Sequence, residues 1–411
     1  MRQFTILAIS YFLPPVLSAQ SIQIGRLLYH SKHRIIAVSG HDDREKEDGG
    51  LYADFHEKMG LHITVPYKYR LPGIIHNIAT KIFTPYSERP DPYKWWIPKA
   101  MHAVQKYIES SDARVDAIVT FGNPMSDHLI GLKFKELFPD VPWVAHFSDP
   151  WVDNPFRRND FLCRKFNRRM EEEVINKAEK VIFTSLETKQ LVMQKYLHIN
   201  ADKAVVLAHS YDTNLYESQK YNNSEKAILF RHVGNFYGHR TPEPLFKALA
   251  ILQRRNAAIL ENIRVELIGG IPRRMLISPA YQALPKGLVE VKKAVGYQES
   301  LQKMQEADVL LVIDAPAEKS VFLPSKLIDY VGAGVDLFGI TPQGTSEKLI
   351  RDLGGTVIDP FDVEGIAKMI ERVIVNSGKE ISVNRSEVRK LYDIRNNSCK
   401  FDQLFTGLCG D

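Results

Sequence analysis

The chain has 411 residues, 44% hydrophobic and 25% charged, which is the composition of an ordinary globular protein long enough for two or three domains. The net charge of +5 is too small to argue for nucleic-acid binding by itself, and it suits anionic ligands or an acidic membrane surface. The three cysteines have no metal-ligand spacing, so we expect no disulfide framework, and a reducing compartment such as the cytoplasm fits best.

The first apolar stretch, residues 4–19, has two interpretations. It superficially resembles a signal peptide, but its basic flank is weak and Pro14 and Pro15 interrupt it. We favour a buried strand over residues 5–10, because a parallel α/β protein often begins this way. No run of 18 apolar residues occurs, so we expect no membrane-spanning helix.

Short apolar runs rich in β-branched residues alternate with helix-length segments along the chain. Runs such as DAIVTF and DVLLVID lack polar alternation, which predicts parallel sheets covered on both faces. In the first half we expect strands near residues 4–9, 35–38, 62–65, 116–120, 143–146, 181–184 and 205–207. In the second half we expect them near 227–233, 264–268, 288–291, 309–313, 336–340 and 356–358.

The polar segment 211–226 has no apolar period and indicates a linker. We therefore expect an N-terminal Rossmann-like domain over 1–210, completed by a C-terminal helix over 386–411, and a second Rossmann-like domain over 211–385. Two such domains leave a cleft, and ligands of open α/β sheets bind beyond the carboxyl ends of the strands.

The segment FLPSKLIDYVGAG, residues 322–334, predicts a short helix that can bind an anion. Pro324 suits the first helical position, and the glycines near its end can close the helix. Free N–H groups at the helix start attract anions, and Lys326 adds a full positive charge. Ser325 and Asp329 share a face about 6 Å apart, which suits a phosphate at one and sugar hydroxyls at the other. The alternative is a simple capped helix with Lys326 and Asp329 solvated.

A second candidate loop, VGNFYGHRTPEP, follows the 227–233 strand. Gly234 and Gly238 permit a tight turn, and Arg240 stands just before a helix start at Thr241 and Pro242. We expect this loop and the Lys326 helix to meet at one diphosphate. The alternative is an ordinary βα loop.

These two segments, with GYQESLQKMQEADVLLVID between them, resemble the retaining glycosyltransferase family 4, and the resemblance covers nearly the whole chain. It implies the α/β GT-B fold, in which two Rossmann-like domains with parallel sheets face across a deep cleft. It also implies sugar transfer from a nucleotide-diphosphate donor with no metal or other cofactor, a diphosphate oxygen helping to deprotonate the acceptor. The donor would contact Gly234, Asn235, Arg240, Pro324, Ser325, Lys326, Leu327 and Asp329.

Two positions depart from the family pattern. Asp329 stands where the family more often has the glutamate that binds the donor ribose, and Val321 stands where an earlier acid is common. Glu318 is close to that position but out of register. Arg240 matches the lysine of the family's first loop, and Asn235 occupies the other basic position.

On the acceptor side, His146 ends a predicted strand and Asp149 follows it. The family often has a His-Asp pair there that hydrogen-bonds the transferred sugar, so with Arg240 and Lys326 these two are our catalytic candidates. The alternative is a core histidine and a helix cap. Ser18 and Ala19 stand where the family often has paired glycines, and Asn123 follows the 116–120 strand, so these three are candidates for the acceptor-side loops.

Two segments are basic and aromatic: residues 67–99, with Trp95, Trp96 and Lys99, and residues 157–169 (RRNDFLCRKFNRR). A basic amphipathic segment can lie on an anionic membrane, which would suit a glycan or lipid-linked acceptor. The alternative is a solvated helix face on which Arg168 and Arg169 pair with Glu172 and Glu173.

Two other functions remain open on the same fold. A sugar-nucleotide epimerase would need further carboxylates around the donor sugar. A non-catalytic nucleotide-sugar-binding partner protein is compatible with the departures at Val321 and at Ser18-Ala19. An NAD-dependent enzyme is disfavoured, because no G-x-G-x-x-G follows the first strand.

Overall fold

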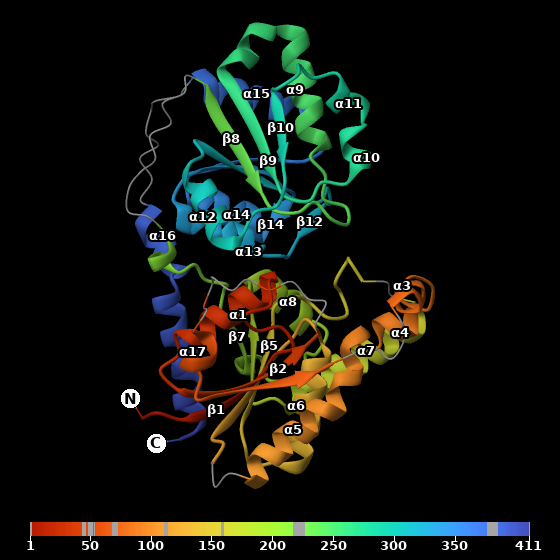
Figure 1. The fold of residues 1–411 in the computed structure, drawn as a ribbon, viewed down its shortest axis with the longest axis vertical. Coiled ribbons are helices and arrows are strands. Elements are labelled where there is room, and N and C mark those ends of the chain that lie inside the picture. The colour runs from red at the N-terminus through yellow and green to blue at the C-terminus, as the bar shows by residue number, and fades with distance from the viewer. Residues whose placement is uncertain are drawn as a thin grey trace. The chain divides into compact units, whose positions relative to one another are not determined.

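The computed structural model describes residues 2–42, 47, 52, 54–67, 73–110, 114–157, 160–216, 227–375 and 385–410. The chain divides into two compact units, each built on one parallel sheet (Figure 1). Unit 1 contains Met1–His209 and Ile394–Asp411, and unit 2 contains Ser210–Asp393.

Unit 1 has a seven-stranded sheet of order β3-β2-β1-β4-β5-β6-β7, in which all neighbouring strands are parallel. The strands are β1 (Thr5–Ile9), β2 (Arg34–His41), β3 (Leu61–Pro66), β4 (Ala117–Phe121), β5 (Trp143–Phe147), β6 (Lys180–Phe183) and β7 (Ala204–Val206). The helices are α1 (Ala19–Tyr29), α2 (Phe55–Lys58), α3 (Gly73–Ile82), α4 (Thr84–Glu88), α5 (Ile97–Ser110), α6 (Ser126–Leu137), α7 (Phe161–Lys177), α8 (Leu186–Met193) and α17 (Ile394–Leu408). Short 3-10 helices are η1 (Pro92–Trp96) and η2 (Ala201–Lys203).

Alternate residues of these strands feed two cores, one on each face of the sheet. Leu7 and Ile9 of β1 pack with apolar residues of α5, α6, α7 and α8, whereas Ile6 and Ala8 pack with those of α1 and α17. Both faces are therefore covered, as a parallel sheet requires. Helix α17 is fixed to this unit because Asp402 accepts hydrogen bonds from the Ser31 hydroxyl at 2.6 Å and the Lys32 N–H at 3.0 Å.

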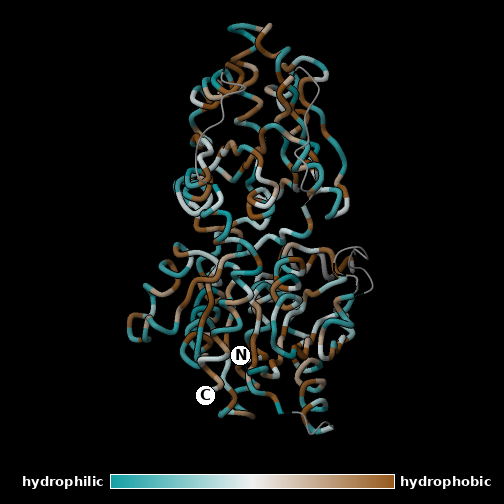
Figure 2. The backbone as a smooth tube through the Cα atoms, turned by 90° about the vertical axis from the view of Figure 1, so that its left-hand side faces the viewer, coloured by the Kyte–Doolittle hydropathy of each residue, from teal (hydrophilic) through white to brown (hydrophobic). Residues whose placement is uncertain are grey.

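Unit 2 has a six-stranded parallel sheet of order β10-β9-β8-β11-β13-β15 and a small pair, β12-β14. The strands are β8 (Ile228–Val233), β9 (Ile263–Ile268), β10 (Val289–Lys292), β11 (Val309–Ile313), β12 (Lys319–Ser320), β13 (Asp336–Ile340), β14 (Gln343–Gly344) and β15 (Thr356–Ile358). The helices are α9 (Glu243–Arg255), α10 (Arg273–Leu276), α11 (Pro279–Gln282), α12 (Tyr297–Gln305), α13 (Ser325–Ala333), α14 (Thr345–Asp352), α15 (Val363–Val375) and α16 (Arg385–Leu391), with 3-10 helices η3 (Thr213–Leu215) and η4 (Ala257–Asn262). Apolar stretches run through the interior of each unit (Figure 2).

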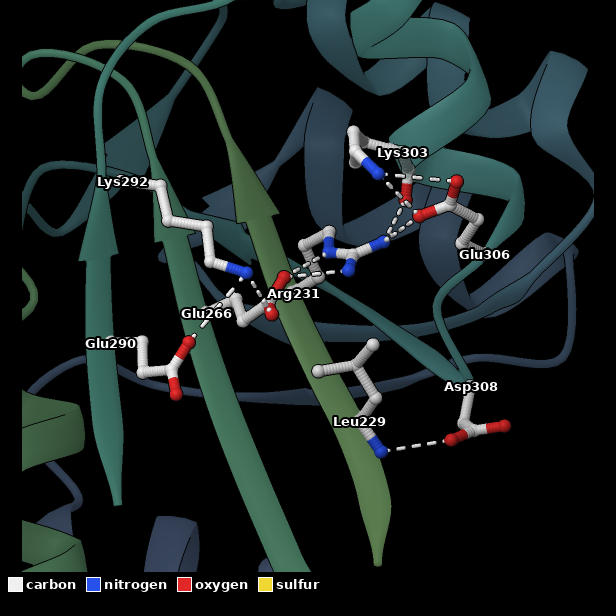
Figure 3. Close-up of polar contacts among 8 residues, drawn as sticks. All are labelled: Leu229, Arg231, Glu266, Glu290, Lys292, Lys303, Glu306 and Asp308. Atoms are coloured by element: carbon white, nitrogen blue, oxygen red, sulfur yellow. Dashed lines mark hydrogen bonds and ion pairs between the residues drawn. The ribbon is translucent and has the colours of Figure 1, made fainter. Parts of the chain in front are cut away.

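A buried ion network links the strands on one side of β8 (Figure 3). Arg231 of β8 lies 2.5 Å from Glu266 of β9, and Lys292 of β10 also pairs with Glu266. Arg231 further contacts the Lys303 carbonyl and Glu306 beside α12. Burial disfavours the Glu266 carboxylate, but hydrogen bonds from Lys292 and Arg231 overcome this effect and lower its pKa. The network holds β8 in place, and β8 carries one half of the candidate site.

The strand pattern predicted from the sequence is confirmed. All thirteen expected strands are present, and the strands at 309–313, 336–340 and 356–358 have the predicted bounds. The two-residue strands β12 and β14 were not predicted, because two residues carry no period. Helix α13 begins at Ser325 with Pro324 as its cap residue, one position later than expected, and it closes at Gly334, whose φ of 71° is left-handed. Among the described residues, no helix has the length and apolar character needed to cross a bilayer.

Candidate functional site

The order of the unit 2 sheet reverses between β8 and β11. The predicted donor-binding residues lie in the loops after these two strands and in the first half of α13. Arg240, in the loop after β8, places its Nε 3.3 Å from Oδ1 of Asp314, which directly follows β11. Both side chains are buried. This ion pair joins the two loops at the point where open α/β sheets bind ligands.

Lys326 lies in the same cluster. Its Nζ is 3.4 Å from Nε2 of His232, the residue before the last of β8. The other ring nitrogen, Nδ1, is 2.9 Å from the Leu311 carbonyl oxygen, so we assign the ring proton to Nδ1. The Nε2 lone pair then accepts a hydrogen bond from the lysine ammonium. Burial and the Lys326 charge lower the pKa of His232 well below its usual value, so this ring is neutral.

The charges around Lys326 favour an anionic ligand. Burial, and then the neighbouring Arg240 guanidinium, lower the pKa of Lys326 to about 7, and the Asp314 carboxylate opposes them. Two basic side chains therefore share one carboxylate inside a desolvated cluster. A phosphate group entering this cluster would supply the missing negative charge and restore the ordinary pKa of the lysine.

The amino end of α13 adds backbone donors to these side chains. No side-chain cap occupies the helix start, and Pro324 precedes Ser325 and Lys326 in the first turn. The Tyr330 hydroxyl fixes this helix to the end of β8, since it accepts from the Val233 N–H at 2.8 Å. Gly234, with φ of 138°, lets the chain pass closely, because a Cβ there would lie 3.3 Å from Cδ of Lys326.

Two residues predicted to contact the donor, Asp329 and Leu327, have side chains that are engaged inside the protein. Asp329 is buried, and its Oδ1 accepts a hydrogen bond of 2.7 Å from the Tyr297 hydroxyl. Its contact with a ribose stays a prediction. The Leu327 side chain is fully buried in the unit and leaves only backbone groups for a ligand.

Asn235 is exposed and ties the loop after β8 to the loop after β9. Its Oδ1 accepts from the Gly270 N–H at 2.7 Å, and the Phe236 N–H donates to the Gly270 carbonyl at 2.9 Å. Asn235 thus shapes the loop through its oxygen and adds no positive charge where the family more often has a basic residue.

Sequence reasoning missed four residues that organise this cluster: His232, Asp314, Tyr237 and Tyr330. Tyr237 holds Arg240, because its hydroxyl accepts from Nη1 at 2.7 Å and its ring lies 4.9 Å from the guanidinium carbon. Asp314 directly follows a predicted strand, so the rule that sites lie at strand ends could have found it. His232 lies inside the predicted strand at 227–233 and gave no such signal.

On the unit 1 sheet, His146 lies near the end of β5 and is buried. Burial, and then the nearby His209, lower the pKa of His146 to about 3, so the ring is neutral. Its Nδ1 has no hydrogen-bond partner among the residues that the structure describes, and the same holds for one ring nitrogen each of His62 and His128. Asp149 is half-buried in the loop after β5 and makes contacts of its own.

The other acceptor-side candidates surround the reversal of strand order between β1 and β4. The Ser18 hydroxyl caps α1 by accepting from the Ser21 N–H at 3.0 Å, and Ala19 is the first residue of that helix. Asn123 is exposed after β4 with φ of 81°. Gln20, which was not predicted, joins these loops, because it donates to the Gly122 carbonyl at 3.0 Å and accepts from the Ser148 hydroxyl at 3.0 Å.

No protein-family model and no curated protein sequence matches this chain. Solved structures do match over its full length. HepE of Anabaena, in complex with UDP and glucose, aligns with a TM-score of 0.68 at 14% identity over 98% of this chain and 100% of HepE. A glycosyltransferase of Rickettsia africae aligns with a TM-score of 0.65 at 14% identity, with both chains fully covered. The N-terminal domain of Candida albicans trehalose-6-phosphate phosphatase aligns with a TM-score of 0.71 at 15% identity over 99% of this chain and 97% of that domain.

At these identities the matches show the fold. With the seven-stranded and six-stranded parallel sheets, they define an α/β protein of the GT-B fold. Membership of glycosyltransferase family 4 stays a prediction.

Proposed function

We propose that this chain transfers a sugar from a nucleotide-diphosphate donor to a glycan or lipid-linked acceptor, with retention of anomeric configuration and without a metal. The observation that carries this proposal is the cluster of Arg240, Lys326 and the amino end of α13 at the switch point of the unit 2 sheet. A pair of cations beside unused backbone donors suits a diphosphate better than a neutral ligand.

The reaction requires charge stabilisation at this cluster. Cleavage of the bond between the sugar C1 and the donor phosphate oxygen leaves that electron pair on the diphosphate. The acceptor hydroxyl oxygen bonds to C1 on the face that the diphosphate leaves, and its proton passes to a diphosphate oxygen. Charge-assisted hydrogen bonds contribute about 1.5–3 kcal/mol each. Two of them with a helix end would stabilise a diphosphate by roughly 3–8 kcal/mol. The part of this stabilisation that is gained only as the bond breaks and the charge grows lowers the barrier.

We assign the transferred sugar to His146 and Asp149, and the donor ribose to Asp329. A neutral His146 can exchange hydrogen bonds with sugar hydroxyls, and its unpartnered Nδ1 supports this role. UDP-sugars are the first donors to test, because HepE was crystallised with UDP and glucose. We place the protein in the cytoplasm, where its three free thiols, those of Cys163, Cys399 and Cys409, would stay reduced.

The test is nucleotide release from UDP- and GDP-sugars, with Lys326→Met as the inactive variant. Release of the nucleoside diphosphate by the wild type alone supports the proposal. Conversion of the donor sugar without an acceptor would indicate an epimerase, and nucleotide affinity without turnover would indicate a binding partner protein. If the wild type neither releases nor binds any nucleotide, the proposal is wrong.

A further inference from the structure

Eight of the large apolar side chains that unit 1 exposes lie on or beside α3 and the start of α7. Ile74 and Ile82 of α3 and Phe161 of α7 are 78%, 77% and 79% exposed. Exposed apolar residues of the same region are Ile75, Ile78, Phe83, Phe156 and Leu162. Single exposed apolar residues are normal, but a group of this size marks an interaction surface.

The apolar residues of α3 lie on one face of that helix. Ile74, Ile78 and Ile82 are four residues apart, and Ile75 follows the first of them. At about 100° per residue, the four occupy an arc of about 100°. Helix α3 therefore presents an apolar stripe outward, in the manner of a helix that has a partner outside its own unit.

Helix α4 links α3 to α7. Helix α3 packs on α4, and α4 packs on α7, on one side of unit 1 (Figure 1). The junction is fixed by polar contacts of Glu88, at the end of α4. Its carboxylate pairs with Arg157 at 2.9 Å, and its carbonyl accepts from the Asn167 amide of α7 at 2.7 Å. The Arg89 guanidinium also lies over the Phe166 ring. We call the eight exposed apolar residues named above the α3–α7 patch.

Exposed basic side chains border the patch. Lys165, Arg168 and Arg169 follow the apolar tip of α7 by one and two turns. The acids around these residues have other partners: Asp160 caps α7, Glu171 pairs with Lys195, Glu172 contacts His198, and Glu173 pairs with Lys177. No ion pair of these three basic residues is found in the described parts of the chain. The Arg168–Glu172 and Arg169–Glu173 pairs, which belong to the alternative interpretation as a solvated helix face, are thus absent there. Arg158, Lys68, Tyr69 and Arg70 of the predicted basic segments lie outside the described residues, and Trp96 is buried in the core.

We propose that the α3–α7 patch docks unit 1 onto an anionic phospholipid surface. Apolar side chains that enter the acyl boundary, with a basic border that meets anionic headgroups, are the two features that interfacial binding requires. The basic border selects an anionic lipid surface over a neutral one. This surface belongs to unit 1 alone, so vesicle binding and the proposed sugar transfer can succeed or fail separately.

The experiment is co-sedimentation of the full-length protein with vesicles of phosphatidylcholine alone or with about one third phosphatidylglycerol. One variant, Ile74→Ser with Ile82→Ser, removes apolar contacts. A second, Lys165→Gln with Arg168→Gln and Arg169→Gln, removes charge. Matched controls are Leu197→Ser and Lys106→Gln, exposed positions of unit 1 outside the patch. Thermal melts verify that every variant is folded, as expected for substitutions at exposed sites.

Wild type and controls should bind the anionic vesicles, more weakly at high salt. The charge variant should bind roughly a hundredfold more weakly, at about fivefold per basic residue. The apolar variant should also lose binding while keeping its salt dependence. Equal binding to neutral vesicles, no binding, or unchanged binding by both variants would overturn the proposal. So would a wild-type dimer that becomes monomeric in the apolar variant, since the patch would then be an interface between copies of this chain.

Discussion

Binding of a nucleoside diphosphate should be coupled to proton uptake by Lys326. In the empty protein the pKa of Lys326 is about 7, compared with 10.5 for an ordinary lysine, so the site disfavours the charged form by roughly 5 kcal/mol. Burial is the largest cause of this low pKa, the Arg240 charge is the second, and the Asp314 carboxylate opposes both. A diphosphate brought against the ammonium should return the pKa to near 10.

The sign of the effect follows from linkage. The pKa of Lys326 is higher in the UDP complex than in the free protein. The contribution of the ammonium to UDP binding is therefore fully present below pH 7, and it is lost as the pH rises toward the pKa of Lys326 in the complex. Lys326 is half protonated at about pH 7 and about 1% protonated at pH 9, so UDP affinity should fall about fiftyfold, or roughly 2 kcal/mol, between these values.

Isothermal titration calorimetry in buffers of different ionisation enthalpy measures this coupling. We expect uptake of about 0.5 proton at pH 7, rising to nearly 1 at about pH 8.5. Lys326→Met should bind UDP weakly with no uptake, whereas Lys319→Met, at an exposed lysine on β12, should behave as the wild type. Tight UDP binding by the wild type with no proton uptake would refute the assignment of Lys326 to the diphosphate.

Three further substitutions test the surroundings of the site. His232→Phe keeps a ring beside Phe236 but removes the hydrogen-bond acceptor for Lys326. UDP should therefore bind roughly fivefold to tenfold more weakly, and the midpoint of the pH dependence of UDP binding should move to lower pH. An unchanged pH dependence would show that His232 does not stabilise the Lys326 ammonium. Tyr330→Phe leaves the buried Val233 N–H without its partner and should cost about 1–3 kcal/mol, a fall in Tm of about 3–10 °C by calorimetry. Glu266→Gln leaves the buried Arg231 with only the more distant carboxylate of Glu306, at 3.4 Å, and should cost about 3–5 kcal/mol. A Tm within a degree of the wild type would show that the network does not stabilise unit 2.

The sequence determined the strand pattern well because each run of apolar β-branched residues carries its own signal. The meeting of Arg240 with the Lys326 helix was also predictable, since both follow neighbouring strands at one sheet edge. The contact between Lys326 and His232 was not predictable. His232 lies within the run ILFRHV, where it has no local feature that distinguishes a core histidine from one that faces a lysine.

The orientation of α13 also depends on tertiary packing. Leu327 faces the interior and Asp329 meets Tyr297, a residue 32 positions earlier in the chain. Spacing places Ser325 and Asp329 on one helix face, but it does not say how that face is turned. The sequence of α3 likewise does not show which way the helix is turned. Its apolar period is typical of a helix that faces the core, but in the structure the apolar stripe is exposed.

A crystal structure of the full-length protein with UDP tests the donor site most directly. We predict the diphosphate within hydrogen-bond distance of the Arg240 guanidinium, the Lys326 ammonium and the N–H groups of Ser325 and Lys326. A fully occupied UDP whose phosphates touch neither side chain would contradict the assignment of this cluster to the donor.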